Sequence, residues 1–172
     1  MRVALVRHPR ALVAAGVCYG RTDLALAPDD GMALAAIRAA LGTFGGIVWS
    51  SPARRCQEIA AGLTPSPRLD HRLLELDFGD WEGRAWDAVP RAAFDRWAAD
   101  PLGFAAPGGE SGATLVTRVT AFHAAIQQRG DCVVVAHGGP LRVLGALLRG
   151  QRIDLFAPSP PLGSVTWIAP AG

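Results

Sequence analysis

The chain has 172 residues and a mass of 18.0 kDa, the size of one ordinary domain, and half of its residues are hydrophobic. Its net charge is +2, and all 17 basic residues are arginines. The sequence contains neither lysine nor asparagine. This composition excludes Schiff-base and P-loop lysine chemistry as well as N-glycosylation sequons. Any bound anion must therefore be held by arginine, histidine, helix termini or backbone amides.

The charge and cysteine patterns indicate a protein of the reducing cytoplasm. The arginines are scattered rather than clustered, which does not favour nucleic-acid binding, and no apolar stretch has the length of a membrane span or a signal peptide. Three cysteines without short spacing predict neither a disulfide framework nor a zinc site. Without internal repeats or a linker, residues 1–172 are expected to form a single domain, and the oligomeric state stays open.

The first half of the chain alternates strands with helices. Residues 2–7 are a short, mostly apolar run that predicts a buried strand. An Ala-rich stretch at 32–41 follows two acidic residues and ends before a glycine, which is typical of a helix. Residues 47–50 predict a second strand, and a proline near its end suits the opening of a helix over 53–63.

The middle of the chain is less regular. Residues 73–81 are expected to be irregular or strand-like. Apolar residues recur at helical spacing over 86–99 and 113–129, which predicts two helices. The stretch 100–112 between them is rich in glycine and proline and predicts a surface loop.

The last elements settle the expected fold class. Residues 132–136 are the clearest buried strand of the sequence, a helix is predicted over 140–148, and a last strand over 164–168. Strands that alternate with helices indicate βαβ units. We therefore expect an α/β fold, a three-layer sandwich whose mainly parallel sheet carries helices on both faces.

Polar side chains follow three of the predicted strands. His8 follows the first strand, Ser51 the second, and His137 follows the strand at 132–136. Ligands of parallel sheets bind beyond the carboxyl ends of the strands, where amides of the next helix attract anions. A single histidine there is most often structural, but two histidines with arginines at one edge predict an anion site. Serine-hydrolase, cysteine-phosphatase, paired-aspartate and zinc-peptidase motifs are absent from the sequence.

The sequence resembles the histidine phosphatase superfamily, the phosphoglycerate-mutase-like proteins. Five blocks carry the resemblance in the family's order: Arg7-His8, Ser50-Ser51-Pro52 with Arg55-Cys56, Glu75 to Gly83, Pro107 to Ser111, and His137-Gly138-Gly139. Within the superfamily, residues 18–23 and 76–83 are most similar to the alpha-ribazole phosphatases of cobalamin assembly. The resemblance implies the phosphoglycerate-mutase-like form of the three-layer sandwich.

The resemblance also implies a metal-independent phosphomonoesterase that acts through a phosphohistidine and needs no cofactor. His8 would be the nucleophile, and Arg7, Arg55 and Gly138 would bind the phosphoryl oxygens. His137 would complete this clamp and stabilise the charge of the transferring group. The family pattern places the phosphate arginine directly before a small residue, which selects Arg55 over its neighbour Arg54.

Further roles follow from the same resemblance with alternatives left open. Glu75 is the expected general acid, and Glu82 is the alternative. Tyr19, Arg21 and Glu110 are candidates for substrate contacts, although each could equally be structural or face solvent. The acidic residues around Glu82 are expected to be solvated rather than to hold a metal.

The sequence departs from the family near the nucleophile. The usual glycine after it is Pro9, and the following acidic residue is Arg10. The family's phosphate-contacting asparagine cannot exist here, and Ala14 occupies its neighbourhood. We expect this donor to be lost, or to be replaced by Arg21, Arg10 or a backbone amide.

Hydrolysis is favoured over mutase activity because the segment between Glu75 and His137 is short. The expected partner is a small phosphorylated metabolite, with alpha-ribazole 5'-phosphate or a cobamide 5'-phosphate as the first expectation. A broad-specificity sugar-phosphate or nucleotide phosphatase is the alternative. A non-catalytic phosphate-binding module is the alternative from another class.

Overall fold

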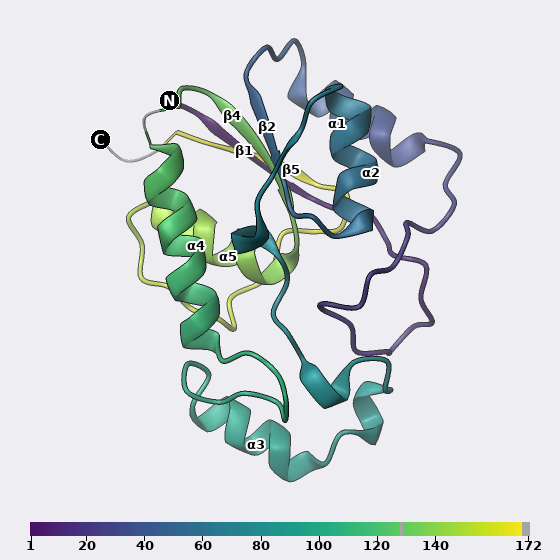
Figure 1. The fold of residues 1–172 in the computed structure, drawn as a ribbon, viewed down its shortest axis with the longest axis vertical. Coiled ribbons are helices and arrows are strands. Elements are labelled where there is room, and N and C mark those ends of the chain that lie inside the picture. Colours follow the sequence, from purple (N-terminus) through teal and green to yellow (C-terminus); the bar gives the residue numbers. More distant parts are fainter. Residues whose placement is uncertain (128, 170–172) are drawn as a thin grey trace.

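A five-stranded sheet forms the centre of the structure, a computed structural model that describes residues 1–127 and 129–169 (Figure 1). The strand order is β3-β2-β4-β1-β5, with bounds β1 Val3–Arg7, β2 Ile47–Ser50, β3 Arg68–Leu69, β4 Cys132–Ala136 and β5 Val165–Ile168. Strands β1 to β4 are parallel, and β5 runs antiparallel to β1. The mainly parallel sheet expected from the sequence is confirmed.

The register of the central strands brings their carboxyl ends together. Arg7 at the end of β1 is paired with Ala136 at the end of β4, and Ser50 at the end of β2 is paired with Val135. The residues that follow β1 and β2, His8 and Ser51, continue the pairing with β4, because their amides donate to carbonyl oxygens of that strand. The three polar junctions predicted from the sequence therefore leave the sheet at one edge.

Helices cover both faces of the sheet, which confirms the three-layer sandwich (Figure 1). The helices are α1 Met32–Leu41, α2 Arg54–Leu63, α3 Arg91–Ala99, α4 Gly112–Ile126 and α5 Gly138–Leu148. Helices α1 and α2 pack on one face, and α4 and α5 pack on the other. Helix α3 lies apart from the sheet, beyond the carboxyl ends of the strands.

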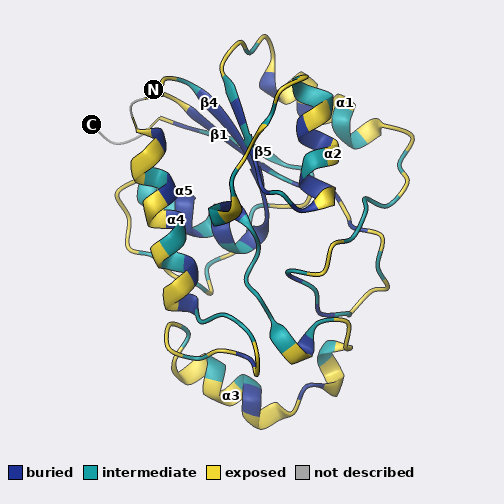
Figure 2. Cartoon of the chain, viewed as in Figure 1, coloured by how far each residue is buried: buried dark blue, intermediate teal, exposed yellow. Residues whose placement is uncertain are grey.

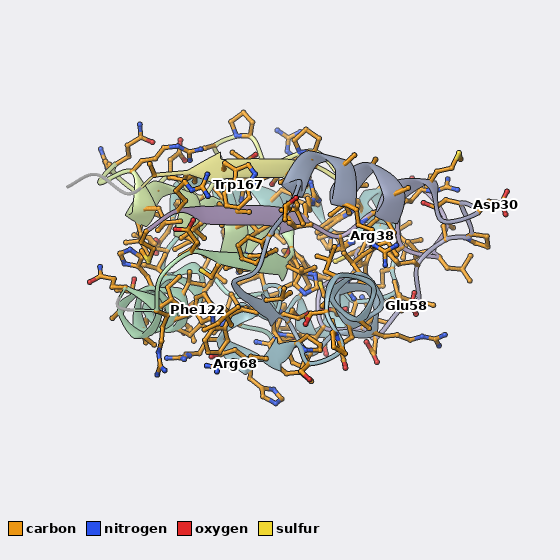
Figure 3. All side chains as sticks on the ribbon, turned by 90° about the horizontal axis from the view of Figure 1, so that it is seen from above. Asp30, Arg38, Glu58, Arg68, Phe122 and Trp167 are labelled. Atoms are coloured by element: carbon orange, nitrogen blue, oxygen red, sulfur yellow. The ribbon has the colours of Figure 1, made fainter. Side chains whose placement is uncertain are left out.

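Alternation along the strands supplies both cores. Val3 and Leu5 of β1 pack with α4 and α5, whereas Ala4 and Val6 pack with α1 and α2. Phe122 of α4 fills the layer between that helix and the sheet, while charged residues such as Glu58 and Asp30 lie at the surface (Figure 3). Every residue of β4 is buried, because this strand lies in the middle of the sheet.

A third cluster of buried residues lies outside the two sheet cores, and we call it the aromatic cluster. Trp81 is its central residue, with ring centroids of four other aromatic residues 5.7 to 6.4 Å away. Its members are Cys18, Phe78, Trp81, Trp86, Val89, Ala93, Phe94, Trp97, Phe104 and Ala106. The cluster joins α3 to the loops around it at the far end of the molecule (Figure 2).

Several elements begin one or two residues away from their predicted starts, and three larger differences from the sequence predictions stand out. The helix predicted over 86–99 is interrupted, because Pro90 cannot continue a helix from the turn at Trp86–Ala88, and α3 begins only after it. Strand β3 was not predicted, since two exposed residues carry no periodic signal. Helix α4 ends at Ile126 rather than at residue 129.

Gln128, inside that predicted helix, and residues 170–172 of the predicted domain lie outside the described residues. Within the described ranges, no helix has both the length and the apolar character needed to cross a bilayer.

Candidate active site

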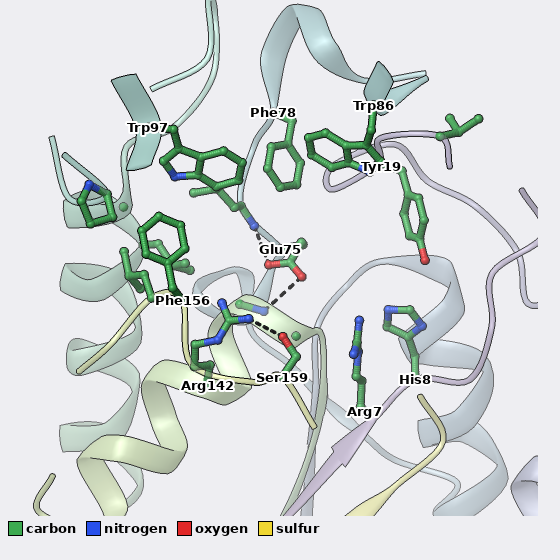
Figure 4. A pocket seen from close by; sticks show the side chains of 18 of the residues that line it. Arg7, His8, Tyr19, Glu75, Phe78, Trp86, Trp97, Arg142, Phe156 and Ser159 are labelled. Carbon is green, nitrogen blue, oxygen red and sulfur yellow. Dashed lines mark hydrogen bonds between the residues drawn. The ribbon is translucent and has the colours of Figure 1, made fainter. Parts of the chain in front are cut away.

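The shared strand edge opens into a cavity of about 370 Å³ (Figure 4). The charged and polar residues that line it are Arg7, His8, Tyr19, Arg55, Glu75, Arg142 and Ser159, together with the glycines 138 and 139 at the start of α5. Three guanidinium groups therefore face one carboxylate. This balance suits a ligand that carries more than one negative charge, such as a phosphate monoester.

His8 is only 2% exposed and is held in one tautomer. Its Nδ1 lies 2.6 Å from the carbonyl oxygen of Pro9, which can only accept, so Nδ1 carries the proton. Burial, together with the nearby charges of Arg55 and Arg7, lowers the pKa of His8 to about 3, although the bond to Pro9 acts in the opposite direction. The second nitrogen, Nε2, is therefore unprotonated and available as a nucleophile.

Arg55 is fully buried beside this nucleophile. Its Nε donates to His8 Nε2 over 3.3 Å, and its two terminal nitrogens donate to the carbonyl oxygens of Gly20 and Thr22 over 2.6 and 2.9 Å. The ring of Tyr19 lies 5.3 Å from its guanidinium carbon. Arg55 is thus oriented by the loop at 20–22.

Arg54, the alternative phosphate arginine, lies at the surface. Its Nε pairs with Glu58 over 2.7 Å, one helical turn along α2, and its side chain is 63% exposed. Because adjacent residues of a helix point in different directions, only Arg55 can face the cavity. The geometry agrees with the choice made from the family pattern.

Glu82, the alternative general acid, is occupied elsewhere. Its carboxylate accepts the amides of Gly20, Arg21 and Thr22 over 3.0, 2.8 and 2.9 Å, and also the Thr22 hydroxyl. Burial alone would raise the pKa of Glu82, but these hydrogen bonds lower it below its ordinary value. This carboxylate lies outside the cavity lining, and it holds the loop that orients Arg55.

Glu75 lies at the centre of the cavity, between the two ends of the lining (Figure 4). Its Oε2 accepts the amide of Gly139 over 3.2 Å, and its Oε1 accepts the amide of Leu76 over 2.9 Å. The structure thus brings Glu75 together with His8 and Arg55, as a general acid requires.

Arg118 of α4, which was not predicted from the sequence, fixes the backbone of Glu75. Its guanidinium donates to the carbonyl oxygens of Arg72, Leu74 and Glu75 over 2.7, 2.6 and 3.1 Å. It also pairs with the carboxylate of Glu110 over 2.6 and 2.8 Å. No sequence signal pointed to it, because the contacts depend on how α4 packs against a distant loop.

Two of the three predicted substrate contacts do not line the cavity. Arg21 donates from Nε to the backbone oxygen of Glu75 over 2.8 Å, and Glu110 is buried against Arg118. Burial alone would raise the pKa of Glu110, but the bonds from Arg118 lower it. Both residues therefore lie behind the loop that carries Glu75. Tyr19, the third candidate, does line the cavity.

His137 is buried against the nucleophile. The ring centroids of His8 and His137 are 5.0 Å apart, and His137 Nε2 lies 2.8 Å from the hydroxyl oxygen of Ser51. Burial, with the charge of Arg55, lowers the pKa of His137 well below its ordinary value. Both rings are therefore neutral near pH 7.

Glycines 138 and 139 allow close approach to the first turn of α5. A Cβ at position 138 would lie 3.3 Å from the guanidinium of Arg7 and 3.0 Å from Ser159 Oγ. A Cβ at position 139 would come closer than 3.0 Å to Glu75 Oε1. Arg7 is held from the other side, because its Nη1 donates to the carbonyl of Pro160 over 2.7 Å.

The structure narrows what could replace the missing asparagine. Ala14 and Arg10 are exposed and do not line the cavity, and Arg21 is bonded behind it. The hydroxyl of Tyr19 instead points toward His8 (Figure 4).

One wall of the cavity is formed by residues that were not predicted from the sequence as parts of the site. Aromatic side chains of Phe78, Trp86, Trp97 and Phe156 surround the end away from the strands (Figure 4). Arg142 of α5 reaches the same region. Its position could have been found from the sequence, because it follows Gly138 by one helical turn and so shares its face. In the described part of the chain, no three metal-ligating side chains come together.

The sequence pattern described as "Histidine phosphatase superfamily (branch 1)" matches residues 3–172. The chain belongs to this superfamily. It is accordingly an enzyme, a phosphoric monoester hydrolase, and the resemblance stated from the sequence blocks is confirmed.

Three relatives illustrate the similarity. "Putative phosphoserine phosphatase 2" of Hydrogenobacter thermophilus is 32% identical over 166 residues, covering 89% of this chain and 81% of its own. The crystal structure of a phosphoglycerate mutase from Thermus thermophilus is 28% identical with a TM-score of 0.77, over 97% of this chain and 92% of its own. A "putative alpha-ribazole-5'-P phosphatase" from Escherichia coli shares the fold, with a TM-score of 0.84 at 23% identity over 97% and 89%.

Proposed function

We propose that this histidine phosphatase hydrolyses its phosphomonoester through a phosphohistidine formed on His8, without a metal. The observation that carries the proposal is the state of His8. A buried imidazole with its Nδ1 proton bound to Pro9 presents an unprotonated Nε2 to the cavity that holds Arg55 and Glu75.

The reaction then has two steps at phosphorus. His8 Nε2 attacks, the P–O bond to the leaving group breaks, and Glu75 gives its proton to the departing oxygen. Glu75, now a carboxylate, takes a proton from water, whose oxygen attacks phosphorus while the P–N bond breaks and returns its electrons to His8. Arg7, Arg55 and His137, with the Gly138 amide, stabilise the phosphoryl oxygens in both steps.

Tyr19 supplies the donor that the absent asparagine would have provided. Its hydroxyl points toward His8, and its ring lies against the guanidinium of Arg55 (Figure 4). The hydroxyl therefore faces the phosphate oxygen that Arg55 would bind. A phenol hydroxyl donates one hydrogen bond, which is the same contribution that an asparagine amide makes to a phosphate oxygen.

For the substrate, alpha-ribazole 5'-phosphate or a cobamide 5'-phosphate is the first candidate. Its support is the sequence similarity in residues 18–23 and 76–83 and the aromatic wall, which can stack on a planar base. A broad-specificity phosphatase for sugar phosphates or nucleotides is the second candidate. The relative named for phosphoserine supports the sugar-phosphate part of this candidate, because phosphoserine, like a sugar phosphate, carries no base. In either case a single cytoplasmic catalytic domain, with three buried and reduced cysteines, acts on a small metabolite.

The first test is hydrolysis of p-nitrophenyl phosphate in excess chelator by wild type and His8→Ala. Wild type should be active, and the variant should lose at least a thousand-fold in kcat, because the nucleophile is absent. His71→Ala, which removes an exposed histidine, is the matched control and should keep wild-type activity. Phosphate trapped on wild type should be acid-labile and base-stable. Equal inactivity of wild type and His8→Ala would instead support a non-catalytic phosphate-binding module.

The second test compares kcat/KM for alpha-ribazole phosphate with a panel of sugar phosphates and nucleotides. A preference of at least a hundred-fold for alpha-ribazole phosphate or its cobamide counterpart would support the first candidate. Similar values across the panel would reject it in favour of the broad-specificity enzyme.

A further inference from the structure

Arg142 is a half-buried cation whose hydrogen-bonding capacity is mostly unused. One terminal nitrogen donates to Ser159 Oγ, whereas its Nε is buried and has no hydrogen-bond partner among the residues that the structure describes. Among residues 1–127 and 129–169, no carboxylate oxygen lies within 4.0 Å of it. Arg118, by comparison, is bonded through all three nitrogens to Glu110 and three carbonyls.

This arrangement is costly unless an anion completes it. Burial lowers the pKa of Arg142, whereas the charge of Glu75 acts in the opposite direction. A desolvated charge without a partner destabilises the fold, so a buried guanidinium normally has a carboxylate or phosphate beside it. The carboxylates of Glu75 and Asp154 act on Arg142 only from beyond 4.0 Å, so neither of them is a hydrogen-bond partner of this guanidinium.

The position of Arg142 relative to the reaction defines which part of a substrate it can reach. It follows Gly138 by four residues of α5, a rise of about 6 Å, and Ser159 lies between it and Arg7. Figure 4 shows Glu75 between His8 on one side and Arg142 on the other. A phosphate bound over His8, with its ester oxygen at Glu75, therefore directs its leaving group toward Arg142.

We propose that Arg142 binds a second anionic group, a carboxylate or a phosphate, which the leaving group carries close to the ester oxygen. The inference rests on the proposed function, because the phosphate over His8 fixes where the leaving group begins. A fork of two N–H donors matches either anion, and the nearby Ser159 hydroxyl can donate to the same group once its own acceptor role is satisfied.

The proposal separates the substrate candidates. A monophosphate with a neutral leaving group, such as alpha-ribazole 5'-phosphate, leaves Arg142 without a partner. A cobamide 5'-phosphate has a further phosphate on the same ribose, and phosphorylated hydroxy acids have a carboxylate near the ester. The substrate class is thus a phosphomonoester with a second negative charge about one helical turn from the phosphoryl group.

The test measures competitive inhibition of p-nitrophenyl phosphate hydrolysis by matched pairs of ligands. 3-Phosphoglycerate and glycerol 3-phosphate differ by a carboxylate, and adenosine 3',5'-bisphosphate and adenosine 5'-monophosphate differ by a phosphate. In wild type, at least one pair should show an inhibition constant ten-fold or more lower for the member with the second anion. The pair that shows it identifies which anion the site takes.

Substitution then assigns that preference to one side chain. Arg142→Gln should reduce the ratio of inhibition constants to near one, and Arg142→Lys should retain part of it. Arg149→Gln removes the same charge from an exposed position just beyond α5, outside the cavity, and should leave the ratio unchanged.

A ratio near one for both pairs in wild type, or a ratio that survives Arg142→Gln, overturns the inference. Because the wild-type ratio is measured on its own, the inference stays testable even where a variant folds poorly. Absence of any p-nitrophenyl phosphate hydrolysis in wild type would instead refute the proposed function.

Discussion

Gly139→Ala is a direct test of the position of the Glu75 carboxylate. The added methyl would come closer than 3.0 Å to Glu75 Oε1 and within 3.3 Å of its Cδ, while the next neighbour, Leu115, is at ordinary contact distance. The obstructing atom belongs to the end of a flexible side chain. We therefore expect the carboxylate to move by about 1 Å and helix α5 to stay in place.

The expected cost is catalytic rather than structural. A misplacement of about 1 Å can reduce a rate by about a hundred-fold, close to the lower end of what a general acid contributes. For an alkyl phosphate such as glycerol 3-phosphate, kcat should fall about a hundred-fold, or about 2.7 kcal/mol in the barrier. The assay is steady-state release of inorganic phosphate, with the melting temperature recorded for each variant.

A double-mutant cycle isolates the contact with Glu75. In a Glu75→Ala background the clash is absent, so adding Gly139→Ala should have little further effect on kcat. Gly145→Ala is the matched control on the same helix, because its nearest neighbour is the flexible end of Arg149. Wild-type kcat in Gly139→Ala, or equal losses in both backgrounds, would refute the role given to Glu75.

Two further predictions concern stability. Glu82→Ala should lower the free energy of unfolding by about 3 kcal/mol, because amides of the loop at 20–22 lose a charged acceptor, and kcat should also fall as Arg55 loses its support. Glu58→Ala, which breaks an exposed pair with Arg54 and an exposed 3.3 Å bond from the Leu26 amide, should change it by less than about 1 kcal/mol in chemical denaturation, and equal effects would contradict the assignment. Since burial lowers the pKa of His8 from 6.5 to about 3, the unfolded chain binds more protons between these values. Stability relative to His8→Gln should therefore decrease as pH falls from 6.5 toward 3, by at most about 1.4 kcal/mol per pH unit, and a constant difference would contradict a neutral His8.

The fold was predictable where hydrophobic pattern and turn chemistry agree. The strands at 47–50 and 132–136 and the helix at 32–41 have the predicted bounds, because each is an apolar or Ala-rich run between clear stop signals. The pattern failed where one residue overrides it. Pro90 divides an otherwise periodic stretch, and the pairing of β3 depends on the neighbouring strand rather than on its own sequence.

The candidate site was predictable in part for a related reason. His8, Arg55 and His137 lie directly beyond strands or in the first turn of a helix, so local sequence determines which edge they reach. The expected substrate contact of Glu110 could not be judged in this way. The sequence around Glu110 does not show which side chain its carboxylate contacts in the fold. Arg118 claims that carboxylate from a helix position eight residues later.

The aromatic cluster makes the pocket a composite of two independently packed parts. Its buried members contact one another and not the two cores of the sheet, so the wall around the leaving group and the floor that binds phosphate share few packing constraints. Replacing residues of the wall should therefore alter which alcohol is accepted while the chemistry at His8 persists. A lineage with this architecture can change its range of substrates by repacking the aromatic side chains of residues 86–104, provided that Glu82 keeps its bonds to the loop at 20–22.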